Sequence, residues 1–288
     1  MARFAPKEGM DITNEQWERV APLLSESPDE PKGRGRPVSN DLRQILNGMS
    51  PKTIKEQSEE NMLEQEKYVP PKIAAPGEPH LACVLLLDTS SSMAGPPIDS
   101  LNKALQDFKN KVSMDEMAQK RVDIAIVEFN SVTNVVQEFT PISQMNPVTL
   151  KADGLTAMGA GINKAIDMVK ERNRFYNSLG TPVYKPWIFM ITDGAPTDDI
   201  ENAVRRLQEE ESKGKHGKLK FFALGVAGYN KPTLFRLTKR VMELSGTDFT
   251  GIFNWMSESM VAISVSRVEE DVPLGALPGN VTIPPKDW

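Results

Sequence analysis

The sequence has almost no cysteine. Cys83 is the only one among 288 residues, so an internal disulfide bond cannot form. That composition suits a reducing compartment. The first eight residues contain no apolar run of the signal-peptide type, and no stretch approaches the roughly 20 apolar residues that a membrane-spanning helix needs. We therefore expect a soluble, cytoplasmic protein that does not associate with membranes.

The sequence also lacks an excess of positive charge and the common catalytic motifs. Its net charge of −5 gives no reason to expect the whole molecule to bind nucleic acid. The two histidines, His80 and His216, have no cysteine or serine partner at a suggestive spacing. There is no nucleophile elbow, no phosphate-binding glycine-rich loop and no zinc-ligand spacing. These absences favour a protein that is not an enzyme.

What the sequence does contain is a regular alternation of strand-like and helix-like segments. Four short runs are apolar on both faces, as in a parallel sheet that is covered on both sides: residues 82–87, 124–129, 187–191 and 221–226. Segments with helical spacing lie between them, over residues 98–112, 158–169 and 200–207. Residues 132–139 alternate like an edge strand, and Trp187 is expected to cover the sheet edge. The pattern predicts a three-layer, doubly wound α/β fold with a mostly parallel sheet.

The chain divides into four segments by composition. We expect a short helical segment over residues 1–49 and a polar, proline-rich linker over residues 50–79. The α/β domain is predicted over residues 80–268, and a tail over residues 269–288.

Polar residues follow two of the apolar runs. Asp88, Ser90 and Ser92 come after the first run and Asp193 after the third, while Thr156 lies just before the second predicted helix. In open α/β sheets, ligands bind at the carboxyl ends of the strands, near a switch in strand order. Carboxylate and hydroxyl oxygens are hard ligands, suited to Mg²⁺ or a similar divalent ion rather than to zinc or copper.

This set of residues resembles the metal-ion-dependent adhesion site of von Willebrand factor A and integrin I domains, and the resemblance covers approximately residues 80–268. It implies that Asp88, Ser90 and Ser92 contact the ion directly or through water. Thr156 would coordinate in the ligand-bound state, and Asp193 would act mainly through water. One coordination position would remain for a carboxylate of a protein partner. The implied cation is Mg²⁺, or another divalent ion such as Mn²⁺ or Ca²⁺.

A second resemblance concerns the helical segment near the C-terminus. Residues 253–260, followed by residues 263–267, resemble the C-terminal helix of bacterial TerY-like proteins. This subgroup is associated with tellurite-resistance and stress-response gene clusters. The resemblance implies an adaptor or scaffold in a bacterial stress system, with a PP2C-type phosphatase or a protein kinase as partner.

A third resemblance concerns residues 10–49, which are similar to the N-terminal region of insertion-sequence transposases. The segment has a capped helix start at residues 11–14 and a basic stretch at residues 33–37. The carboxylate-triad nuclease of such transposases has no counterpart here, so transposition is excluded. A flexible basic loop and weak DNA binding through a short arginine arm both remain open.

Three functions therefore compete. The first is a metal-dependent protein-binding adaptor. The second is a Mg²⁺-dependent phosphohydrolase that uses Asp88, although such enzymes usually place a second aspartate where Ser90 stands. The third is a DNA-binding regulator acting through residues 10–49, whose binding would be sensitive to salt.

Overall fold

The computed structural model describes residues 72–285, except residues 147, 213–218, 269 and 271. The described residues belong to one compact unit, Pro71–Trp288. The transposase-like segment and most of the predicted linker lie outside the described residues. Within the described part of the chain, every helix is too short or too polar to cross a lipid bilayer.

A seven-stranded sheet in the order β3-β2-β1-β4-β5-β6-β7 forms the middle layer. Five strands run parallel to one another: β1 (Leu81–Asp88), β2 (Val122–Phe129), β4 (Trp187–Thr192), β5 (Lys220–Gly225) and β6 (Val241–Leu244). The two edge strands, β3 (Thr133–Pro141) and β7 (Val281–Thr282), are antiparallel to their neighbours. The predicted α/β fold is thus confirmed, including the edge position of the alternating segment.

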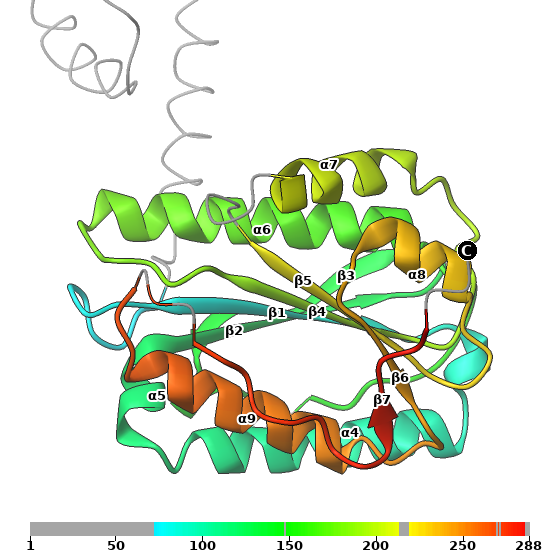
Figure 1. Cartoon of the computed structure of the whole chain (residues 1–288), viewed down its shortest axis with the longest axis horizontal. Coiled ribbons are helices and arrows are strands. Elements are labelled where there is room, and N and C mark those ends of the chain that lie inside the picture. The colour runs from blue at the N-terminus through cyan, green and yellow to red at the C-terminus, as the bar shows by residue number, and fades with distance from the viewer. Residues whose placement is uncertain (1–71, 147, 213–218, 269, 271, 286–288) are drawn as a thin grey trace, which may run out of the picture. The chain divides into compact units, whose positions relative to one another are not determined.

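Helices cover both faces of the sheet (Figure 1). One face carries α4 (Pro96–Val112), α5 (Glu116–Arg121) and α9 (Thr250–Ser264), and the other carries α6 (Met158–Ser178), α7 (Glu201–Ser212) and α8 (Lys231–Leu237). Two short 3₁₀ helices, η1 (Ser91–Met93) and η2 (Ile142–Gln144), complete the described elements.

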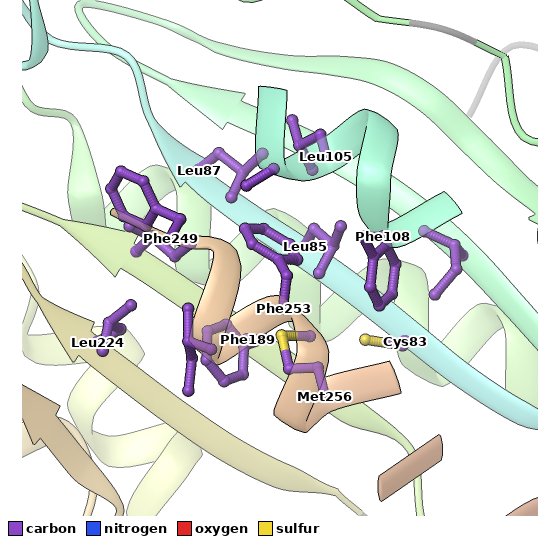
Figure 2. Packing of buried hydrophobic residues seen from close by; sticks show 14 of the residues in the cluster. Cys83, Leu85, Leu87, Leu105, Phe108, Phe189, Leu224, Phe249, Phe253 and Met256 are labelled. Carbon is purple, nitrogen blue, oxygen red and sulfur yellow. The ribbon is translucent and has the colours of Figure 1, made fainter. Parts of the chain in front are cut away.

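The apolar strands fill two cores because successive side chains point to opposite faces. On β1, Cys83, Leu85 and Leu87 face α4 and α9, where Phe108 and Phe253 pack with ring centroids 5.4 Å apart (Figure 2). The alternate residues of β1 face α6 and join the second core. A strand buried on both sides has no polar face, which explains its continuous apolar sequence.

The prediction that Trp187 covers the sheet edge was wrong. Trp187 begins β4, which lies between β1 and β5 in the interior of the sheet. Its side chain is fully buried and stacks on Trp255 of α9, with ring centroids 6.3 Å apart. A large aromatic residue at a strand start therefore covers the core under α9, not an edge.

The residues after α9 return along that helix and end in β7. The indole nitrogen of Trp255 donates to the carbonyl of Gly275 at 2.8 Å, and Val281 of β7 pairs with Leu244 of β6. Part of the predicted tail thus extends the sheet (Figure 1).

The strand order reverses direction at β1. From β1 the chain passes along α4 to β2 on one side, and from β3 it passes along α6 to β4 on the other side of β1. The carboxyl ends of β1 and β4 therefore flank a topological switch point, where open α/β sheets bind their ligands.

Candidate metal centre

Asp88 ends β1 and is the most constrained side chain at the switch point. It is fully buried. Its Oδ1 accepts a hydrogen bond from the Ser90 amide at 2.9 Å, and its Oδ2 accepts one from the Thr192 hydroxyl at 2.5 Å. Both carboxylate oxygens therefore have a donor, which fixes the orientation of the group.

A chain of hydroxyls connects this region to Asp193. The Oγ atoms of Ser90 and Ser92 lie 3.1 Å apart, and the Ser92 hydroxyl donates to Asp193 Oδ1 at 2.6 Å. Ser90 and Asp193 are buried, whereas Ser92 is exposed. The site consequently opens to solvent on the side of Ser92.

The loop that precedes α6 is tied to the loop after β1. The Asp153 amide donates to the Thr89 carbonyl at 2.8 Å, and the Ser91 amide donates to the Gly154 carbonyl at 3.1 Å. Gly154 has a φ of 76°, and a Cβ there would lie 2.4 Å from the Ser131 hydroxyl oxygen. Only glycine fits this close approach.

Thr156, in the same loop, is tied to the loop after β4. Its amide donates to the Thr197 hydroxyl at 3.1 Å, and its carbonyl accepts from the Thr197 amide at 2.9 Å. A Cβ built on Gly194 would lie 3.4 Å from Thr156 Oγ1 and 3.9 Å from Asp88 Oδ2. The hydroxyl of Thr156 and the carboxylate of Asp88 therefore border the same small space.

The two carboxylates at this site, Asp88 and Asp193, dominate its electrostatics. Burial raises the pKa of Asp88; hydrogen bonds from Ser90 and Thr192 oppose that rise, and the neighbouring Asp193 carboxylate adds to it. Among the described residues, no lysine, arginine or histidine forms an ion pair with Asp88 or Asp193. Two largely buried carboxylates thus lie close together without a positive partner, an arrangement that a bound cation would relieve.

The donor set fits a small, hard divalent cation. Every side chain at the site offers oxygen, the ligand that Mg²⁺, Mn²⁺ and Ca²⁺ prefer. Within the described ranges, no group of three or more histidine, cysteine or acidic side chains is placed to hold a metal, so hydroxyls would have to supply part of any coordination shell. The Ser92 hydroxyl suits that task, because it donates its proton to Asp193, accepts from the Ser90 hydroxyl with one lone pair and keeps the other lone pair available.

The structure brings all five predicted site residues to one edge of the sheet, on three loops that are hydrogen-bonded to one another. Thr192, which donates to Asp88, is not among the predicted site residues. Its position directly after the third apolar run, beside Asp193, was the available signal.

Solved structures with similar folds include several adhesion and matrix proteins. The pilus adhesin SpaC from Lactobacillus rhamnosus GG aligns with a TM-score of 0.52 at 11% identity, over 67% of this chain and 31% of the adhesin. The proximal thread matrix protein 1 from the mussel byssus, with a zinc-occupied MIDAS motif, aligns with a TM-score of 0.46 at 17% identity, over 67% of this chain and 47% of that protein. A von Willebrand factor type A protein from Catenulispora acidiphila aligns with a TM-score of 0.44 at 16% identity, over 64% of this chain and 43% of that one.

This chain spans less than half the length of each of these proteins. At 11% identity, the alignment with SpaC shows likeness of fold alone. Among curated proteins, none matches the sequence. The family model of the von Willebrand factor type A domain matches residues 83–243, which is more than half of the chain. The protein therefore belongs to the von Willebrand factor type A domain family.

Proposed function

We propose that this protein is a non-catalytic, metal-ion-dependent protein-binding module. A divalent cation, with Mg²⁺ as the first candidate, would be held by the following side chains: Asp88, Ser90, Ser92, Thr156 and Asp193. The main supporting observation is the pair of largely buried carboxylates, each of which accepts from a hydroxyl and neither of which has a positive partner in the described part of the chain. Such a cation would compensate both charges.

The chemistry that follows is recognition of an anionic group. Because only two of the five side chains carry negative charge, a bound divalent ion would stay electrophilic. The exposed position of Ser92 leaves that side of the site open to a partner. A carboxylate from an aspartate or glutamate of the partner would complete the coordination shell, since hard cations favour anionic oxygen ligands.

The geometry argues against the phosphohydrolase hypothesis. Asp88 is fully buried and its two oxygens are each held by a donor, so the group is poorly placed to move toward a phosphoryl substrate, although its remaining lone pairs could still bind a cation. The residue two positions later is Ser90, so a second carboxylate is missing at the place where a general acid would be expected. The DNA-binding alternative concerns residues 10–49, outside the described part of the chain.

The cellular part of the proposal is an adaptor or scaffold in a cytoplasmic bacterial stress system, of the kind linked to tellurite resistance. It is supported by the resemblance of α9 to the C-terminal helix of TerY-like proteins. A PP2C-type phosphatase and a protein kinase are the first partners to test. The resembling residues of α9 also have a packing role, because Phe253, Trp255 and Met256 are buried against the sheet.

The test is a pull-down from host lysate with Mg²⁺, with EDTA and with the Asp88→Ala variant. Asp107→Ala is the matched control, because Asp107 is an exposed aspartate on α4 outside the site. We expect partners that are captured only by the wild-type and control proteins, and only with Mg²⁺. Equal capture by all proteins, with and without EDTA, would refute the metal-bridged mechanism.

A further inference from the structure

A hydroxyl outside the predicted ligand set lies directly behind Asp88. Thr192 is the last residue of β4, and its side chain is fully buried. The pairing of Leu87 with Ile191 places the next residues of the two strands, Asp88 and Thr192, side by side at the carboxyl edge of the sheet. The Thr192 hydroxyl lies 2.5 Å from Asp88 Oδ2 and 3.2 Å from the Gly194 amide nitrogen.

The direction of each hydrogen bond follows from the chemistry of the groups. A backbone amide can only donate, so the Gly194 N–H donates to the Thr192 oxygen. The single hydroxyl proton of Thr192 is then directed at the Asp88 carboxylate, which can only accept. The Ser90 amide donates in the same way to the other carboxylate oxygen, Asp88 Oδ1. These two donors prevent rotation of the carboxylate.

We propose that Thr192 is a positioning residue for the cation, acting through Asp88; this inference rests on the metal site proposed above. A hydrogen bond from a second residue to a metal-binding carboxylate fixes the direction of the remaining lone pairs, so that binding requires little reorganisation. Thr192 also connects β1 to the loop after β4 through Gly194, and it thereby sets the position of Asp88 relative to Asp193.

The experiment measures Mn²⁺ binding by isothermal titration calorimetry with the full-length chain. Thr192→Val removes the hydroxyl at almost constant volume, and Thr192→Ser restores it. The matched control is Thr238→Val, because Thr238 is also buried, accepts from an amide two residues later and donates to a carbonyl, yet precedes β6 at the opposite edge of the sheet. We expect Thr192→Val to weaken Mn²⁺ binding about 10- to 100-fold. The Thr192→Ser and Thr238→Val proteins should bind with nearly the wild-type affinity.

The outcomes separate this inference from the proposed function. If the wild-type protein does not bind Mn²⁺, Mg²⁺ or Ca²⁺, the metal site itself is refuted. If the wild type binds and Thr192→Val binds equally well, only the positioning role is refuted, and the same holds if Thr192→Ser is as weak as Thr192→Val. Far-UV circular dichroism checks the fold of each variant. If Thr192→Val does not fold, Thr192→Ala, which cannot introduce a steric clash, is judged by the same criteria.

Discussion

A buried ionic cluster at the amino-terminal edge of the sheet provides the sharpest stability prediction. Asp123 Oδ2 accepts from His80 Nδ1 at 3.0 Å, from Arg172 Nη2 at 3.1 Å and from the Tyr176 hydroxyl. Burial, and then the charge of Asp123, raise the pKa of Tyr176, so its phenol remains a donor. The side chain of Asp123 is 1% exposed and that of Arg172 is 3% exposed, so water cannot replace the lost contacts.

Asp123→Asn retains the shape of the side chain but removes the negative charge that Arg172 and His80 share. Removing one partner of a buried ion pair costs about 3–5 kcal/mol, because the other charge is left uncompensated. The guanidinium of Arg172 retains its contacts with the rings of Phe175 and Tyr176, at 4.9 and 4.8 Å, so we expect the lower end of this range. A loss of about 3 kcal/mol corresponds to a fall in Tm of about 6–12 °C for a domain of this size.

Urea unfolding of the full-length chain, followed by far-UV circular dichroism, measures this change in the free energy of unfolding. The control is Glu258→Gln, which breaks the exposed Lys111–Glu258 pair at 2.8 Å and should cost about 1 kcal/mol or less. The double variant Asp123→Asn/Arg172→Met removes both charges and should recover part of the loss. A loss of stability in Asp123→Asn no larger than that in Glu258→Gln, at an unchanged m-value, would contradict a stabilising charge on Asp123.

Three further predictions concern the site and the core. At 100 times its dissociation constant, a bound divalent cation should stabilise the wild-type protein by about 2.7 kcal/mol, which raises Tm by about 5–10 °C in a thermal-shift assay; an equal rise in Asp88→Ala would contradict the site. Burial raises the pKa of Asp88 in the folded protein. The protonated form of Asp88 therefore stabilises the fold below the ordinary carboxyl pKa, and this stabilisation is lost as the pH rises through the raised pKa. In EDTA, thermal unfolding between about pH 3 and pH 7 should show this loss in wild type but not in Asp88→Asn. Cys83 is fully buried and burial raises its pKa, so a thiol reagent at about pH 8 should leave it unmodified until the protein is unfolded; rapid labelling of the native protein would show that β1 is not packed as described.

The local pattern of apolar residues was sufficient to predict the central elements of the fold. The run that became β1 is apolar at every position because both of its faces are covered, and that property is visible without knowledge of its neighbours. The short strand β6 and the two-residue strand β7 were not predicted. Strands of this length carry too little periodicity to be recognised, and β7 is defined only by its pairing with β6.

The candidate residues of the site could be grouped from sequence because each lies near the end of a predicted strand or just before a predicted helix. The convergence of Asp88 and Asp193 follows from the rule that parallel strands place their carboxyl ends at one edge of the sheet. The same pattern includes Thr192, but its contact with Asp88 could not be predicted, because that contact depends on the register between β1 and β4. Register is a property of the paired strands and of the packing on both faces, and no single segment encodes it.

The sequence by itself determined the fold class and the oxygen-rich edge of the sheet, since both follow from short-range patterns of apolar and polar residues. Only the tertiary structure decided that His80, which has no suggestive neighbour along the chain, lies against Asp123, 43 residues away. It also decided that Asp123 is shared with Arg172 and Tyr176. A buried charge is tolerated only where its partners meet in space, and that meeting is set by the packing of α6 on the sheet, which no local pattern records.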